Sequence, residues 1–197
     1  MNVGLRPAHF FLKGFPSLVS YIFSIVPNLN QSRKLYLTIV KIKTDNIFTV
    51  QVATTAHVLF AEEICALMED SAKKRGTGIA KRKPEYITQK MLEGKAIIAI
   101  SSEGELAGFC YIEVWQSKNY AANSGLIVSE KFRNAGLAKR IKQKAFELTR
   151  KKFPDAKMFG ITTSLAVMKI NSELGYKPVT FSELTQDEAF WNGCQSC

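Results

Sequence analysis

The stretch LIVSEKFRNAGLA, residues 126–138, places a glycine-bearing loop between a strand-like apolar run and a basic helix. The first backbone N–H groups of a helix have no partner within the helix, and the helix dipole makes that end partly positive. Gly136 has no side chain to block the close approach of an anion, and Ala138 keeps a nearby position small. Three basic side chains add positive charge: Arg133, Lys139 and Arg140. This order of residue types predicts a phosphate-binding loop.

The pattern excludes two familiar kinds of phosphate loop. A Walker-type loop needs Gly-Lys-Ser/Thr, and a dinucleotide-binding turn needs G-x-G-x-x-G; the chain contains neither. A helix start with a solvated basic face is the alternative to an anion site. The strand before the loop and the amphipathic helix after it favour the anion site.

A carboxylate and a basic loop are the other groups that could do chemistry. Glu113, at the end of a strand pattern, is our candidate for a general base, and an exposed strand-edge carboxylate is the alternative. The loop 73–83, KKRGTGIAKRK, carries Arg75 and Arg82, which suit the binding of a carboxylate. A solvated basic loop is the alternative there.

The cysteines favour reduced thiols over a metal centre. Cys65 and Cys110 lie in a helical and a strand pattern, and Cys194 and Cys197 form a lone CxxC. A zinc site normally needs a second pair, so we expect no metal, and we expect a cytoplasmic protein.

Hydrophobic periodicity and turn residues predict the elements that position these groups. The expected strands are 47–53, 95–101, 105–115, 120–129, 156–163 and 177–182, with Gly125 marking a bulge. The expected helices begin near Thr54 and at Pro84, Leu137 and Ser164. This order predicts an α/β fold with a mixed, mostly antiparallel twisted sheet and helices on both faces. A further strand after 177–182 is not expected.

Charge and composition limit the partners. The chain of 197 residues has a net charge of +10, of which residues 1–47 carry +5 and the remainder another +5. The body is therefore only moderately basic, and we expect no nucleic-acid partner. No apolar run is long enough to cross a membrane, so we expect no stable membrane insertion. Residues 1–47 differ in composition from the rest and are predicted to be a peripheral or poorly ordered extension of a domain at 48–197.

Two stretches resemble the GNAT N-acetyltransferase superfamily. Arg133-Asn134-Ala135-Gly136-Leu137-Ala138 is similar to its acyl-CoA loop, Arg/Gln-x-x-Gly-x-Gly/Ala, and AVMKINSELGYKPV is similar to its second signature. The resemblance implies acetyl-CoA as the acyl donor, with its pyrophosphate on the backbone of residues 134–138. It also implies that the backbone of Ile127 and Val128 pairs with the pantetheine arm, where the sheet parts. Asn171 stands where many members carry the tyrosine that acts as the acid, and it can hydrogen-bond the cofactor.

The acceptor implied is a small-molecule amine. RGTGIAKR and TTSLAVMKINSELGY resemble glutamate N-acetyltransferases of arginine biosynthesis, so L-glutamate or another acidic amino acid is the expected acceptor. A protein or peptide N-acetyltransferase, or a non-catalytic module that binds CoA or nucleic acid, remain alternatives. A homodimer also remains open.

Overall fold

The computed structural model describes residues 47–76, 81–115 and 119–184, apart from the side chains of Arg75, Phe181 and Ser182. The predicted extension at 1–47 and the Cys194/Cys197 pair lie almost entirely outside these residues, and both stay predictions.

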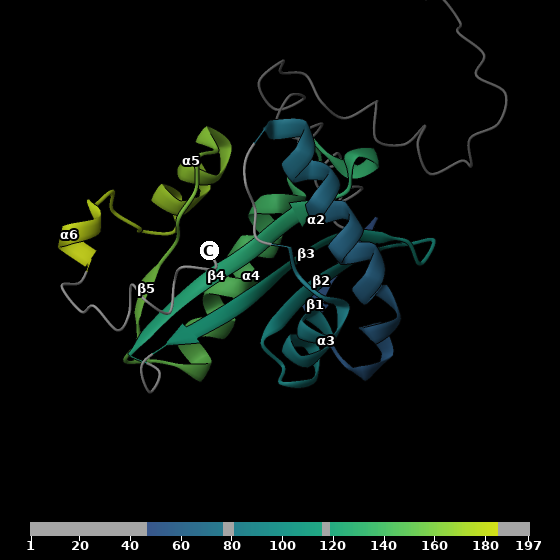
Figure 1. Cartoon of the computed structure of the whole chain (residues 1–197), viewed down its shortest axis with the longest axis horizontal. Coiled ribbons are helices and arrows are strands. Elements are labelled where there is room, and N and C mark those ends of the chain that lie inside the picture. The colour runs from purple at the N-terminus through teal and green to yellow at the C-terminus, as the bar shows by residue number, and fades with distance from the viewer. Residues whose placement is uncertain (1–46, 77–80, 116–118, 185–197) are drawn as a thin grey trace, which may run out of the picture. The chain divides into compact units, whose positions relative to one another are not determined.

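A five-stranded sheet in the order β1-β2-β3-β4-β5 forms the centre of the described domain (Figure 1). Its strands are β1 (Phe48–Val52), β2 (Ala96–Ser101), β3 (Leu106–Trp115), β4 (Tyr120–Val128) and β5 (Lys157–Phe159). The first four pair antiparallel, and β5 pairs parallel to β4. The mixed, mostly antiparallel sheet predicted from the sequence is confirmed.

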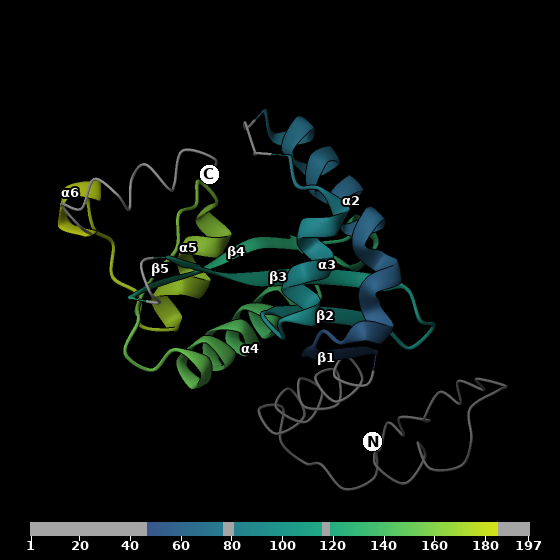
Figure 2. The same cartoon turned by 60° about the horizontal axis from the view of Figure 1, so that its bottom comes forward.

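Helices cover both faces of the sheet (Figure 2). The 3-10 turn η1 (Thr55–Phe60) leads into α2 (Ala61–Arg75), and α3 (Pro84–Leu92) follows on the same face. The helix α4 (Leu137–Lys152) covers the other face and contacts β2, β3 and β4. The shorter elements are η3 (Glu130–Phe132), α5 (Leu165–Glu173) and α6 (Phe181–Leu184).

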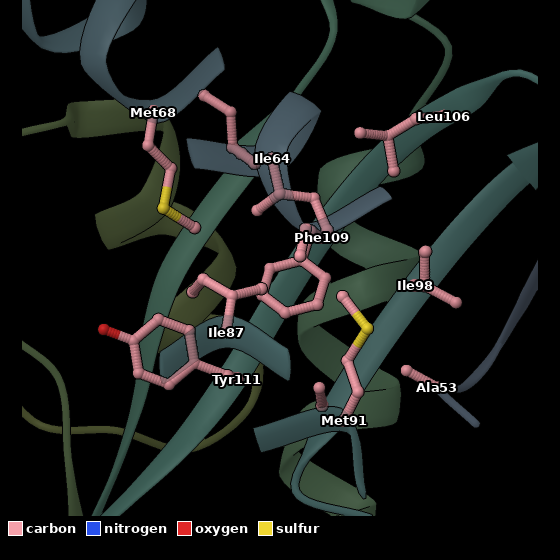
Figure 3. Close-up of a cluster of buried hydrophobic side chains, with 12 residues drawn as sticks. Ala53, Ile64, Met68, Ile87, Met91, Ile98, Leu106, Phe109 and Tyr111 are labelled. Atoms are coloured by element: carbon pink, nitrogen blue, oxygen red, sulfur yellow. The ribbon is translucent and has the colours of Figure 1, made fainter. Parts of the chain in front are cut away.

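Successive side chains of the central strands point to opposite faces of the sheet and form two hydrophobic cores. Ile98 and Phe109 point into the cluster beneath α2 and α3, whereas Ile97 and Cys110 point into the cluster beneath α4. Side chains of successive strand residues alternate between the faces, so β2 is apolar on both because both are covered. Tyr111 lies at the edge of the first cluster, with its hydroxyl directed away from the other labelled side chains (Figure 3).

Gly125 marks a bulge in β4, as predicted. Phe109 pairs with Ile127 and Tyr111 pairs with Ser124, so β4 has one more residue here than β3. Gly125 has a φ of 62°, and a Cβ at this position would lie 2.4 Å from a ring carbon of Tyr111. Both the backbone conformation and the close approach of the ring therefore require glycine.

The predicted strand at 177–182 is wrong. Residues 176–180 have no regular structure, and α6 begins at Phe181. The Thr180 backbone N–H and hydroxyl both donate to Glu183 Oε2, at 2.6 and 2.8 Å, which starts a helical turn. The strand predicted at 156–163 is also much shorter, since β5 has three residues.

Candidate active site

The predicted phosphate loop forms a left-handed turn at the start of α4. Asn134 and Gly136 both have positive φ, 64° and 71°. The first-turn N–H groups of a helix have no partner within the helix. Gly136 is the N-cap of α4 and has no side chain that could accept from these groups. A Cβ at Gly136 would meet nothing within 4 Å, which leaves the approach to those N–H groups open. Residues 133–138 thus have the backbone geometry of an anion site.

The basic side chains around this loop do not all face it. Arg140 Nη2 donates to the carbonyl of Phe48 at 3.0 Å, so this guanidinium turns to β1. Arg133 stays at the loop, where it donates to the carbonyl of Val128 at 3.4 Å and pairs with Glu130. Lys139 reaches α5, with its Nζ 2.5 Å from a carboxylate oxygen of Glu173. Backbone N–H groups therefore supply much of the local positive potential.

β4 and β5 part where the pantetheine arm is expected. Their pairing ends at Ala122 and Phe159, although β4 continues to Val128. The half of β4 that carries Ile127 and Val128 is consequently paired with β3 but not with β5. Backbone groups on this side of β4 can accept an extended ligand in place of a strand.

A second feature is a pocket of about 540 Å³ between α3 and the bulged part of the sheet. It contains two of the predicted site residues, Glu113 and Arg82. The lining residues are Lys81, Arg82, Lys83, Glu85, Tyr86, Gln89, Tyr111, Glu113, Trp115 and Ser124. Arg75, near the start of the predicted basic loop, is not among these lining residues. It is the last residue of α2, and its side chain is outside the described part of the structure.

Glu113 is held within this pocket by two residues of α3. Its Oε1 accepts from Lys90 Nζ at 2.7 Å, and its Oε2 accepts from the Tyr86 hydroxyl. The side chain of Glu113 is 19% exposed, so it is not the exposed strand-edge carboxylate that the sequence left open. Burial, and then the hydrogen bond to Glu113, raise the pKa of Tyr86, so this phenol stays neutral and donates.

Tyr86 and Lys90 were not predicted as partners of Glu113. They lie on one face of α3, four residues apart, and face β3 because Ile87 and Met91 anchor the helix on the sheet. Only the i, i+4 spacing within an amphipathic helix could have suggested that they act together.

Arg82 is positioned by the aromatic side of the pocket. Its Nε donates to the Tyr111 hydroxyl at 2.9 Å, and its guanidinium carbon lies 5.8 Å from the centre of the Tyr86 ring. Tyr111 is buried by packing against Phe109 and Tyr86, which fixes the position of its hydroxyl. A cation held in this way is pre-organised for an anionic ligand.

Asn171 is separate from this pocket, on α5. It is 7% exposed, and its Oδ1 is a buried polar atom with no hydrogen-bond partner. An unsatisfied buried amide oxygen is costly, which fits a place at which a ligand group donates.

The described residues contain neither a cluster of metal-ligand side chains nor a helix able to span a membrane. Nowhere in 47–76, 81–115 and 119–184 do three His, Cys, Asp or Glu side chains gather as a metal would need. The helices in these segments also fall short of the length and apolarity that crossing a membrane requires.

Comparison with known proteins identifies the fold. The model of the Acetyltransferase (GNAT) family matches residues 63–166, just over half of the chain. A search of the curated proteins finds no match.

Solved structures share the fold at low identity. The N-acetylglutamate synthase of Neisseria gonorrhoeae, complexed with coenzyme A and N-acetyl-glutamate, is 15% identical with a TM-score of 0.58. That match covers 76% of this chain but only 33% of the synthase, so this chain spans a third of that protein. A GNAT acetyltransferase of Staphylococcus aureus is 14% identical with a TM-score of 0.57, covering 72% of this chain and 91% of that one. Rv2747 of Mycobacterium tuberculosis, in complex with CoA and NLQ, is 16% identical with a TM-score of 0.52, over 73% and 86%.

Proposed function

The chain belongs to the GNAT acetyltransferase family and is an acyl-CoA-dependent N-acyltransferase, and on that premise we propose that its acceptor is the α-amine of an acidic amino acid such as L-glutamate. The donor is acetyl-CoA. The observation that carries the choice of acceptor is the cationic wall of the pocket around Glu113.

The charge balance of this pocket favours an anionic ligand. Three cationic residues are part of its lining, Lys81, Arg82 and Lys83, of which Lys81 is paired with Glu69 at 3.2 Å. Of the two carboxylates in the lining, Glu113 is already paired with Lys90. A carboxylate entering the pocket would meet a net positive field and charge-assisted hydrogen bonds from Arg82.

The proposal gives each site residue a role. The backbone of Asn134, Ala135, Gly136, Leu137 and Ala138 would hold the pyrophosphate, with Arg133 beside it. The backbone of Ile127 and Val128 would hold the pantetheine arm. Glu113 would accept the proton that the attacking amine loses, directly or through a water molecule. Arg82, and Arg75 from the end of α2, would bind the side-chain carboxylate of the acceptor.

Two further observations support the assignment. The N-acetylglutamate synthase that shares the fold was solved with N-acetyl-glutamate, which is the product expected from this acceptor. Cys65 and Cys110 are free thiols, which suits the cytoplasm, where amino-acid biosynthesis takes place.

The test is CoA release measured across free amino acids, peptides and polyamines, followed by substitution of Arg82. We expect release with glutamate or aspartate. Arg82→Ala should raise the acceptor KM by about 10- to 150-fold, because a hydrogen bond to a charged group contributes about 1.5–3 kcal/mol. The acetyl-CoA KM should change little.

Lys73→Ala is the matched control. It removes the same charge from an exposed residue of α2 that pairs with Glu69 and is not among the pocket's lining residues, so it should leave both KM values near those of the wild type. If a peptide amine is acetylated and glutamate and aspartate are not, the acceptor is a protein or peptide. If the protein binds DNA in a salt-dependent way and has no affinity for CoA, it is a nucleic-acid-binding module.

A further inference from the structure

Lys142 of α4 is a buried ammonium group in an otherwise solvated series of basic residues. Its side chain is 2% exposed. Its Nζ donates to the carbonyl of Asn123 on β4 at 3.4 Å and lies 5.5 Å from the centre of the Tyr176 ring. No carboxylate in the described part of the chain forms an ion pair with it. Burial of a charge without a counter-ion is costly, so its position calls for an explanation beyond stability.

Lys142 occupies the point where β4 and β5 part. Ala122 is the last residue of β4 that pairs with β5, and Asn123 is the next. The ammonium therefore lies on β4 directly beyond the end of β5, beneath the gap in the sheet. Figure 1 shows α4 running behind β4 in this region, with α5 near β5.

Asn171 lies beside this ammonium. A Cβ built on Gly160 would lie 3.7 Å from Lys142 Nζ and 3.5 Å from Asn171 Nδ2, so both nitrogens border the same small volume. Asn171 carries an amide, and an amide does not release a proton at neutral pH. The Oδ1 of Asn171 has no hydrogen-bond partner, so this volume contains an unsatisfied hydrogen-bond acceptor.

Within the described segments, the side chains that form hydrogen bonds around Asn123 and Lys142 are uncharged. Asn123 Oδ1 accepts from the Tyr176 hydroxyl at 3.1 Å, and Asn123 Nδ2 donates to Thr149 Oγ1 at 2.8 Å. The titratable groups that face Lys142 among the residues placed by the structure are the Cys110 thiol of β3 and the Tyr176 hydroxyl. The guanidinium of Arg150, further along α4, acts on Tyr176.

We propose that the Lys142 ammonium, buried beneath the gap between β4 and β5, is the general acid of the acyl transfer. The amine nitrogen forms a bond to the thioester carbonyl carbon, and the C–S bond breaks with its electron pair passing to sulfur. Sulfur takes the proton from Lys142 Nζ, and the new amide nitrogen loses a proton to Glu113 or to water. Lys142 regains a proton from solvent when CoA leaves. This role holds for any acceptor amine and does not depend on the acidic amino acid proposed above.

Proton affinities in the cluster agree with this assignment. Burial lowers the pKa of Lys142, which makes its ammonium a better proton donor. Burial raises the pKa of Tyr176 instead, which makes its hydroxyl a poorer donor to a thiolate. Burial also raises the pKa of Cys110 to about 11, so this thiol is neutral at pH 7 and does not compensate the ammonium. A general acid is most efficient when its pKa lies near the operating pH, and burial shifts the pKa of Lys142 in that direction.

The first test titrates the thiol of bound CoA by the ultraviolet absorbance of its thiolate, with S-methyl-CoA, which cannot ionise, as the blank. In the wild type, a neighbouring ammonium should lower the thiol pKa by at least one unit relative to free CoA. In Lys142→Met, which keeps the length and bulk of the side chain, this shift should disappear. A wild-type thiol that titrates as in free CoA overturns the proposal, and this measurement needs no folded variant.

The second test separates proton donation from charge. Lys142→Arg keeps the charge, so the thiol pKa should stay low, but a guanidinium does not release a proton. We expect kcat to fall by about 10²- to 10⁴-fold in both variants, with the acetyl-CoA KM little changed. The decline of the wild-type kcat at high pH, where Lys142 loses its proton, should be absent from Lys142→Met. If Lys142→Arg retains the wild-type kcat, the residue acts by charge alone and is not the acid.

Discussion

A substitution at the bulge of β4 tests whether the close approach of Gly125 and Tyr111 positions the residues of the acceptor pocket. Gly125→Ala adds a Cβ to a residue with a φ of 62°. The Cβ would lie 2.4 Å from Tyr111 Cε1 and 2.8 Å from Met68 Cε. The methionine end can move, but the Tyr111 ring is buried and its hydroxyl accepts from Arg82, so the ring cannot move without losing that contact.

The magnitude follows from two separate costs. A left-handed conformation costs a non-glycine residue about 1–2 kcal/mol. Overpacking against a fixed ring costs about 1–3 kcal/mol more. We therefore expect Gly125→Ala to lower the free energy of unfolding by about 2–5 kcal/mol, measured by urea denaturation with the slope m unchanged. Because Tyr111 positions Arg82, the acceptor KM should also rise in the folded fraction.

Gly136→Ala is the matched control for this substitution. Its φ is 71°, but a Cβ there meets nothing within 4 Å, so only the conformational cost of about 1–2 kcal/mol applies. The difference between the two variants measures the packing against Tyr111. If Gly125→Ala lowers the free energy of unfolding no more than Gly136→Ala does, Tyr111 is not fixed at the bulge and does not pre-organise Arg82.

Two further predictions concern the phosphate loop and the buried thiol. Gly136→Asp should weaken acetyl-CoA binding by at least about tenfold relative to Gly136→Asn. Both side chains tolerate a positive φ, and only aspartate repels the pyrophosphate at the helix start. Equal dissociation constants for the two variants, measured by calorimetry, would show that this loop is not the cofactor site. Burial raises the pKa of Cys110 to about 11, whereas a thiol in the unfolded chain has a pKa of about 8.5. The stability that the neutral Cys110 thiol contributes is therefore complete below about pH 8.5 and is lost as the pH rises towards 11. Urea titrations from pH 8 to 11 should show an alkaline decline that is about 3 kcal/mol smaller in Cys110→Ala, and equal slopes would show that the thiol titrates freely in the folded protein.

Local sequence signals predicted the central part of the fold well. Strands β2, β3 and β4 and helix α4 lie where alternation, turn glycines and helical spacing placed them, because those elements bury one regular face or both. Gly125 was assigned correctly to a bulge, since a positive φ leaves a direct mark on the choice of residue.

The carboxyl-terminal part was harder to predict because a strand needs a neighbour. KPVTFS has strand-forming residues, yet Thr180 and Glu183 carry a capping box, T-x-x-E, that starts α6 instead. That local signal was present in the sequence and was missed. The length of β5 had no such signal, since it depends on where β4 and β5 part.

The polar site could be predicted only in part. Glu113 and Arg82 were named from their residue types, and the structure brings them to one pocket. The contact of Arg140 with β1 was not predicted, because a helical surface position does not say which neighbour a long side chain will reach. Lys142 looked like any other basic residue of α4, and its burial follows only from its place beneath the gap in the sheet.

The order of strands in the sheet has a consequence for how the chain folds. Each strand pairs only with its neighbours along the chain, and the β2-β3-β4 meander is closed by the short segments 102–105 and 116–119. These contacts are local, so the meander can form early at a low cost in loop-closure entropy. β1 must wait for α2 and α3, and β5 must wait for the crossover through α4. The phosphate loop and the gap between β4 and β5 would then be completed in the last step, after the acceptor side of the sheet has been built.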